Sequence, residues 1–148
     1  MLYFLSIRLL NFVKILVINM KINLTSVFVE NQEEALKFYV EKLGFLKKTD
    51  FPLGKDRWLT VVSPESPHAT ELLLEPNSNP IAKNYQQGLF AQGIPAMSLE
   101  SIDIQEEYRI LVSRGVIFRQ KPTDYKGVLI EIFDDTCGNL IQIHQKSS

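Results

Sequence analysis

Residues 24–44 read LTSVFVENQEEALKFYVEKLG, and this stretch carries the strongest signal of tertiary structure in the chain. The β-branched and aromatic residues of 24–29 predict a strand. Asn31 follows as a helix N-cap, and Glu34 comes three residues later, which is the spacing of a capping box. Apolar residues then recur at helical spacing as far as Gly44, which is expected to end the helix. The stretch therefore predicts a strand that leads directly into an amphipathic helix.

The same order of signals returns in the second half of the chain. A strand is expected over residues 94–99, Asp103 takes the N-cap position, and Gly115 ends the helix. Asn31 and Asp103 are 72 residues apart, and Gly44 and Gly115 are 71 apart. Such a repeat indicates two structural units related by a pseudo-twofold axis. Each unit alone is too small to bury its sheet, so the two must pack together.

Three more strands are expected after each helix. They are residues 45–49, 57–62 and 71–74 in the first half, and 116–120, 128–133 and 140–144 in the second. The linker is expected to hold a short helix with Pro80 in its first turn. The prediction is an α+β fold of two βαβββ modules, with module one at 20–76, a linker at 77–92 and module two at 93–145.

The composition is that of an ordinary globular domain. The 148 residues are 45% hydrophobic and 22% charged, with a formal net charge of −1, which leaves room for one domain with its own core. Lys and Arg are spread thinly without a basic stripe, so a nucleic-acid partner is not expected. Cys137 is the one cysteine, so no internal disulfide can form, and a cytoplasmic location is expected.

Residues 1–19 differ from the rest of the chain, because they are nearly all apolar. Arg8 and Lys14 lie inside the span and disfavour a transmembrane helix. The order of charged and small residues is not that of a secretory signal. We therefore expect Met20 to be the functional start and residues 1–19 to be an upstream extension. The alternative is a membrane anchor, and a membrane partner is expected only in that case.

Alternation along the strands assigns the side chains to two faces. The aliphatic faces are expected to pack on the helices, and the mixed faces to line a cleft between the modules. In the fourth strands, Glu71 lies on the cleft face of one module, and Gln142 and His144 on that of the other. Matching the third strands at an offset of 71 adds Trp58 and Glu131 to the cleft.

An apolar lining with a few convergent polar groups is typical of a small-ligand site. The alternative is that these faces are simply the second half of the core. Glu71 is the candidate catalytic residue, either as a general base or as the partner of a cationic or hydroxylated ligand. The other expected ligand-binding residues are Trp58, Glu131, Gln142, His144 and Ser26. Core packing remains the favoured interpretation for Trp58, and an ion pair with a nearby Lys or Arg is the alternative for Glu71.

Three segments resemble the vicinal oxygen chelate superfamily, which includes glyoxalase I, bleomycin-resistance proteins and extradiol dioxygenases. VFVENQEEALKFYVEKLGF at 27–45 is similar to the opening of such a domain. ELLLEP at 71–76 resembles its metal-bearing fourth strand, and FDDTCGNLIQIHQ at 133–145 resembles its closing hairpin. The resemblance covers about residues 20–145. It implies an open half-barrel of paired modules, the glyoxalase/bleomycin-resistance fold, and a homodimer.

Metal-dependent members of that superfamily hold a divalent ion with one ligand from each first strand and one from each fourth strand. Carried over to this chain, these positions are Leu24, Glu71, Ile94 and Gln142. Glu71 is a strong ligand and Gln142 a weak one, whereas Leu24 and Ile94 have no donor atom. We therefore expect no native metal and no other cofactor, with Glu71 and Gln142 as the weak metal candidates.

The sequence favours a protein that binds a small organic molecule in the cleft between its modules, without a metal. One alternative is a metal-dependent lyase, isomerase or dioxygenase of the glyoxalase type. Another is a structural or regulatory dimer module without a ligand. The missing donors at Leu24 and Ile94 favour binding over metal chemistry, and the retained Glu71 favours it over a ligand-free module. Whether the cleft forms within one chain or across a dimer is left open.

Overall fold

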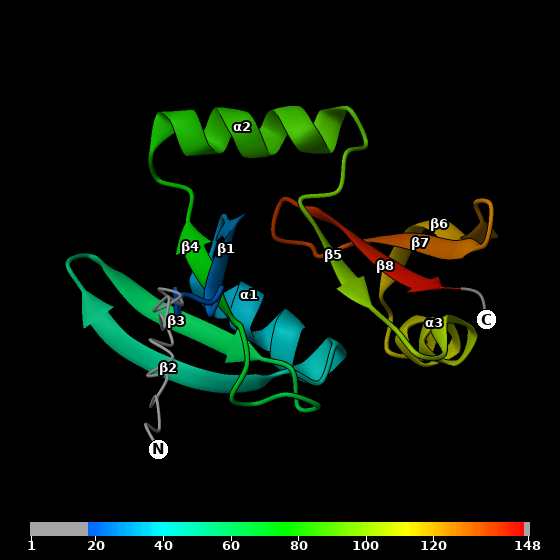
Figure 1. Ribbon diagram of the computed structural model, residues 1–148. Helices are drawn as coiled ribbons and strands as arrows, with labels where there is room; N and C mark the ends of the chain where they lie inside the picture. Colours follow the sequence, from blue (N-terminus) through cyan, green and yellow to red (C-terminus); the bar gives the residue numbers. More distant parts are fainter. Residues whose placement is uncertain (1–17, 147–148) are drawn as a thin grey trace, which may run out of the picture.

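The computed structural model describes residues 18–146, which form two four-stranded sheets joined by a helix (Figure 1). The first module consists of β1 (Leu24–Val29), α1 (Gln32–Lys37) with a π-helical turn η1 (Phe38–Lys42), β2 (Leu46–Leu53), β3 (Asp56–Val62) and β4 (Glu71–Pro76). The linker helix is α2 (Pro80–Ala91). The second module consists of β5 (Met97–Glu100), α3 (Ile104–Ser113), β6 (Ile117–Asp124), β7 (Val128–Asp134) and β8 (Leu140–Lys146).

Both sheets have the same topology, which confirms the predicted pair of βαβββ modules. The strand order is β1-β4-β3-β2 in the first sheet, called sheet A, and β5-β8-β7-β6 in the second, called sheet B. The first and fourth strands of each module are parallel, and the remaining neighbours are antiparallel. A parallel pair of this kind needs a crossover connection, which the helix of each module provides.

Most of the apolar extension at residues 1–19 lies outside the described residues, which begin at Ile18. Residues 18–23 run without regular structure into β1, and the Asn23 carbonyl accepts the Glu71 N–H at 2.8 Å. Within residues 18–146, no helix is both long enough and apolar enough to cross a membrane.

The predicted helix boundaries are confirmed by the cap geometry. The Asn31 carboxamide oxygen accepts the Glu34 N–H at 3.0 Å, and the Asp103 carboxylate caps α3 in the same way. Gly44 and Gly115 follow the helices with φ angles of +78° and +79°. Only glycine adopts these angles without strain, so both helices end where the sequence indicates.

One core joins the two modules. The face of each sheet that packs on helices is its helix face, and the opposite face is its open face. Both helix faces contribute to a single cluster, with Leu59 from sheet A and Ile141 from sheet B. Between them, the ring of Phe38 stacks on that of Phe133 at a centroid distance of 6.0 Å, and Tyr39 joins the same cluster. Because the helix faces share one core, the open faces turn away from that core, on its opposite sides.

The two helices are also linked end to end. The Lys42 ammonium donates to the Arg114 carbonyl at 2.5 Å, and the Arg114 guanidinium donates to the Lys42 carbonyl at 2.7 Å. These residues are 72 positions apart, which is the period of the repeat. Each cation satisfies a carbonyl at the end of the other helix, where the helix dipole favours positive charge. The reciprocal pair therefore lies on the pseudo-twofold axis.

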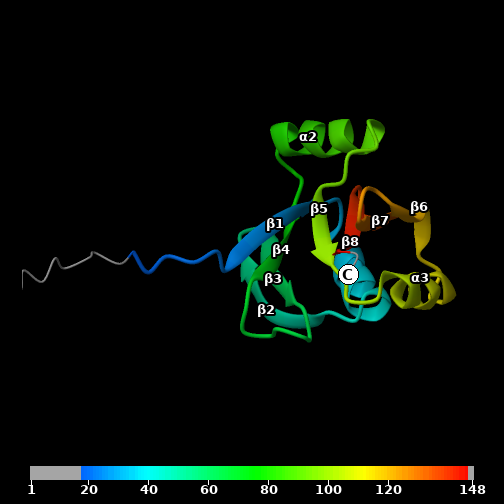
Figure 2. The same cartoon turned by 45° about the vertical axis from the view of Figure 1, so that its right-hand side comes forward.

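The linker helix α2 spans both modules and is anchored by Gln86, which is 4% exposed (Figure 2). Its amide nitrogen donates to the Phe28 carbonyl at 2.7 Å and to the Cys137 carbonyl at 3.0 Å. Its amide oxygen accepts from Asn77 at 2.6 Å. These bonds join β1, the end of β4 and the turn between β7 and β8, so α2 holds the modules in one arrangement.

Candidate ligand-binding site

The open face of sheet A combines apolar and polar side chains. Opposite residues in neighbouring strands share a face, so the strand register identifies its members. They are Leu24, Ser26, Phe28, Thr49, Phe51, Leu53, Trp58, Thr60, Val62, Glu71, Leu73 and Glu75. Leu24 is 39% exposed and Leu53 56% exposed, so this apolar surface is available to a ligand or a partner.

Trp58 lies on this open face, as alternation along β3 predicts. Its ring stacks on Phe51, with centroids 6.4 Å apart and an interplanar angle of 15°. Phe51 is 48% exposed, and Trp58 is half-buried. The pair forms a flat aromatic platform next to the polar residues of β4. Trp58 is outside the core cluster, so its packing leaves it free to contact a ligand.

Glu71, the first residue of β4, lies on the same face. One carboxylate oxygen accepts the Thr60 hydroxyl at 2.7 Å, and the other lies 3.1 Å from the Lys48 ammonium. The hydrogen bond from Thr60 lowers the pKa of Glu71, and the Lys48 charge adds to this against the opposing effect of burial. Glu71 is therefore a carboxylate at neutral pH. It is better suited to accept hydrogen bonds from a ligand than to remove a proton.

The open face of sheet B carries a chain of three polar side chains. The Gln142 amide nitrogen donates to the Ser98 hydroxyl oxygen at 2.9 Å. The same hydroxyl lies 2.8 Å from Nδ1 of His144. The sequence predicts both Gln142 and His144 for the site, and the structure brings them together through Ser98. Ser26, another predicted site residue, is exposed on the other sheet, directly opposite Leu73.

Ser98, and not Ile94, is the structural counterpart of Leu24, so this part of the predicted ligand set is wrong. Leu24 pairs with Glu71 in sheet A, and Ser98 pairs with Gln142 in sheet B. The strand expected at 94–99 begins only at Met97. Pro95 cannot donate to a strand ladder, and the Ile94 N–H returns to the Leu89 carbonyl of α2 at 2.9 Å. The register with β8, rather than the spacing of the repeat, identifies Ser98.

The predicted position of Glu131 on the cleft face is also wrong. Thr60 lies opposite Leu73, but Ile130 lies opposite His144. The fourth-strand residues Leu73 and His144 are 71 positions apart in the sequence. Their third-strand partners, Thr60 and Ile130, are only 70 apart. The connection from third to fourth strand is therefore one residue longer in the second module. A shift of one residue moves every side chain of a strand to the other face.

Glu131 consequently lies within the helix-face core of sheet B. It is fully buried, and neither carboxylate oxygen has a hydrogen-bond partner among residues 18–146. Burial, with a smaller contribution from the charge of Glu107, raises the pKa of Glu131 to about 8. Leu129 and Phe133, which lie on the same side of β7 as Glu131, pack into the same core.

A cavity of about 330 Å³ lies between the open face of sheet B and the end of α2. It is lined by Phe90, Ala91, Gly93, Arg119, Gln120, Ile132 and Leu140. Ile132 is directly opposite Gln142, so the cavity adjoins the polar chain of β5 and β8. The Arg119 guanidinium lies 5.6 Å from the Phe90 ring centroid, and this cation–π contact forms one wall.

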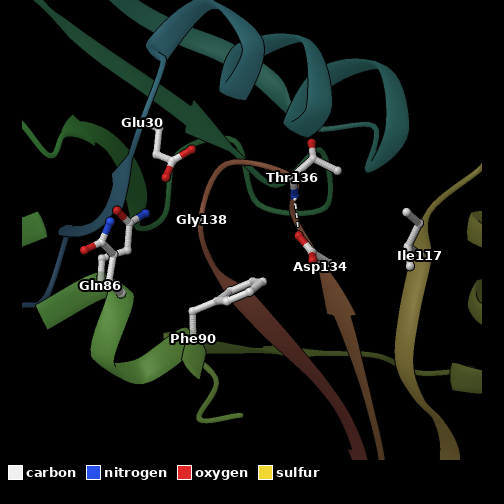
Figure 3. Close-up of a pocket in the computed structure, with 8 residues that line it drawn as sticks. Glu30, Gln86, Phe90, Ile117, Asp134, Thr136 and Gly138 are labelled. Atoms are coloured by element: carbon white, nitrogen blue, oxygen red, sulfur yellow. Dashed lines mark hydrogen bonds between the residues drawn. The ribbon is translucent and has the colours of Figure 1, made fainter. Parts of the chain in front are cut away.

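A second cavity, of about 400 Å³, lies at the seam between the modules (Figure 3). Its walls include Gln86 and Phe90 of α2, Glu30 after β1, and Asp134 at the end of β7. The Asp134 carboxylate accepts the Thr136 N–H at 2.8 Å. None of the residues predicted for the binding site lines this cavity.

The donor set on the open faces does not fit a divalent metal. The four positions implied by the strand register are Leu24, Glu71, Ser98 and Gln142. They offer one carboxylate, one hydroxyl and one amide, whereas a bound ion needs several strong donors to replace its water. In the part of the chain that the structure describes, no three His, Cys, Asp or Glu side chains gather as a metal site.

Comparison with known proteins identifies the family. The family model of the glyoxalase/bleomycin resistance protein/dioxygenase superfamily matches residues 21–143. The chain belongs to this superfamily. The protein YurT of Bacillus subtilis (strain 168) is 57% identical to it over 127 residues, which cover 86% of this chain and 100% of YurT. The superfamily resemblance of the three sequence segments is thereby confirmed.

Solved structures with the same fold include two proteins of 28% sequence identity. UcmS2 matches with a TM-score of 0.74 and 28% identity, over 86% of this chain and 98% of its own. TnmS3, an antibiotic binding protein from Streptomyces sp. CB03234, matches with a TM-score of 0.67 and 28% identity, over 86% of this chain and 97% of its own. Both likenesses extend over the two modules and the linker helix.

Proposed function

We propose that the protein is a homodimer that binds a small organic molecule without a resident metal. In this proposal, the open face of sheet A in one chain meets the open face of sheet B in the other. The observation that carries it is that the two open faces, each with polar groups in an apolar setting, turn away from one shared core. A second chain is therefore needed to bring Glu71 close to the partner's Gln142 and His144.

The sheet edges support this arrangement. β1 and β5 are the outer strands of their sheets, and both carry the polar open-face residues. An outer strand has unpaired N–H and C=O groups that can associate with a strand of another chain. Leu24 in β1 is 39% exposed and Ile94, three residues before β5, is 43% exposed, and a partner would bury this apolar surface.

The chemistry of the faces indicates the class of ligand. The aromatic platform of Phe51 and Trp58 suits a planar apolar body, and ionised Glu71 suits a hydrogen-bond donor or a cation. The similarity to TnmS3, an antibiotic binding protein, supports a binding role on this fold. The weak donor set argues against the alternative, a metal-dependent lyase, isomerase or dioxygenase. We also place the protein in the cytoplasm, since its free Cys137 is buried and forms no disulfide.

The chain has one tryptophan, so fluorescence of Trp58 reports directly on the open face of sheet A. We expect compounds from a panel of antibiotics and aromatic ketones to change this fluorescence and to raise the melting temperature. Sedimentation should show a dimer. A monomer that binds such a compound at one site per chain would contradict the proposal.

Chain mixing tests whether each site is shared between two chains. Homodimers of Glu71→Ala and of His144→Ala each carry two defective sites. A mixed dimer of these variants would carry one intact site and one doubly defective site. Free exchange of equal amounts of the two variants makes about half of the dimers mixed, so we expect about a quarter of the native number of sites to be restored, measured by titration of Trp58 fluorescence. Binding that is not restored on mixing would place both residues in one chain's site.

A further inference from the structure

We propose that Ser98 sets the hydrogen-bond polarity of the open face of sheet B, so that this face binds its ligand through a carbonyl oxygen. The inference rests on the proposed binding function and specifies the chemistry of one half of the site. It arises from a residue that the repeat spacing did not identify. Ser98 acts as a positioning residue, and His144 is the group that would contact the ligand.

We assign the direction of the hydrogen bonds from the donor at one end. The Gln142 amide nitrogen is only a donor, and it donates to the Ser98 oxygen at 2.9 Å. The Ser98 hydroxyl hydrogen is then free to be donated to Nδ1 of His144, 2.8 Å away. An Nδ1 atom that accepts a hydrogen bond carries no proton. The neutral imidazole therefore carries its proton on Nε2.

Nε2–H is thus the group that this face offers to a ligand. Nε2 of His144 makes no hydrogen bond within residues 18–146, and Glu100, directly opposite His144 in β5, makes none to it. The side chain is half-buried on the open face, above a strand whose alternate residues pack in the core. A donor in this position can bind an acceptor oxygen of the ligand, and it disfavours a ligand that presents a donor group there.

The surroundings of the donor are apolar. Ile130 and Ile132 lie directly opposite His144 and Gln142 on the same face. Ile132 and Leu140 also line the cavity of about 330 Å³ under the end of α2. In this proposal a flat hydrocarbon body packs on these side chains while its carbonyl oxygen accepts from His144. The ligand class is therefore a small cyclic ketone or a related carbonyl compound.

The protonated nitrogen can be observed directly. Nitrogen-15 NMR of the dimer at a pH where histidine is neutral should show an unprotonated Nδ1 and a protonated Nε2 for His144. The chain has two histidines, so His68→Gln assigns the signals. A protonated Nδ1 would mean that His144 donates to the Ser98 oxygen, which has two lone pairs and can accept from Gln142 as well. That outcome would overturn the inference, because Nε2 would then be an acceptor.

Two probes of nearly the same shape test the consequence for binding. 1-Indanone carries a carbonyl oxygen, and indane is the corresponding hydrocarbon. We expect Ser98→Ala to weaken binding of 1-indanone about fivefold, the effect of one neutral hydrogen bond, and to leave indane binding unchanged. Ser113→Ala, which removes an exposed hydroxyl from α3, is the matched control and should leave the binding of both probes unchanged.

The outcomes separate this inference from the proposed function. If the native protein binds both probes equally and Ser98→Ala changes neither, the cleft binds small molecules but the assigned polarity is wrong. If Ser98→Ala weakens both probes alike, Ser98 has only a structural role, and the inference is likewise overturned. If neither probe binds the native dimer, the proposed binding function itself loses support together with the inference.

Discussion

At the scale of single residues, Glu131 is the side chain whose surroundings suit its charge least. Its carboxyl group is fully buried and lacks a hydrogen-bond partner in the described range 18–146. The folded protein therefore holds the proton up to about pH 8, whereas the unfolded chain releases it near the ordinary value of 4.5. The folded state binds more protons between these values, so the free energy of unfolding decreases as the pH rises through this window.

Glu131→Met should remove this pH dependence, because Met fills a similar volume without an ionisable group. We expect the variant to be more stable than the native protein above about pH 8, by roughly 2–4 kcal/mol. The gain should shrink towards about pH 5, by at most about 1.4 kcal/mol per pH unit. Urea unfolding at both pH values measures this, with Glu65→Gln in an exposed loop as the control. A gain that is equal at both pH values would show that the group does not titrate on unfolding.

At the scale of elements, the contact between α2 and the turn from β7 to β8 holds the modules together. Gly138 in this turn has a φ of +102°, and a Cβ atom there would lie 2.6 Å from the Gln86 amide nitrogen. Alanine would therefore be strained in its backbone and would displace the side chain that anchors α2. The turn and the helix constrain each other at this one residue.

Gly138→Ala and Gly88→Ala make the same chemical change with opposite expected results. Gly88 lies in α2, where an added Cβ atom would meet no neighbouring atom within 4 Å, so alanine should stabilise the helix by about 0.5–1 kcal/mol. Gly138→Ala should destabilise the protein by at least about 2 kcal/mol. Denaturant midpoints of the two variants test this, and a Gly138→Ala variant as stable as the native protein would refute the close contact.

At the scale of the whole molecule, the shared core makes the two modules one folding unit. The Tyr39 hydroxyl donates to the Asp135 carboxylate at 3.1 Å across the module boundary, and both side chains are fully buried. Tyr39 belongs to η1, and this helical turn therefore contributes to the core that both sheets share. Neither sheet can lose its partner without exposing its own helix face to water.

Tyr39→Phe should destabilise both modules together. Loss of the hydrogen bond leaves a buried carboxylate oxygen with one partner fewer, at a cost of about 1–3 kcal/mol. Trp58 fluorescence reports on the first module, and circular dichroism reports on both. We expect the two signals to change in one coincident transition in the native protein and in the variant. Two separate transitions would show that the modules fold independently.

The features that the sequence predicts correctly depend on residues that are close together in the chain. Asn31 and Asp103 are identifiable as caps, and Gly44 and Gly115 as helix ends, because each acts within one helical turn. Alternation within its own strand places Trp58 on the open face. The order of strands and helices, and with it the superfamily, follows from such local signals repeated twice.

Strand register and the orientation of each sheet depend on contacts between residues that are distant in the sequence. Only the tertiary structure could therefore establish them. Glu131 lies in the core because one connection is a single residue longer, and Ser98 takes the place expected for Ile94 because β5 aligns with β8. The orientation of the open faces away from each other follows from η1, whose Phe38 and Tyr39 join the core shared by both sheets. Alternation names the two sides of a strand, but only packing between elements establishes which side meets water.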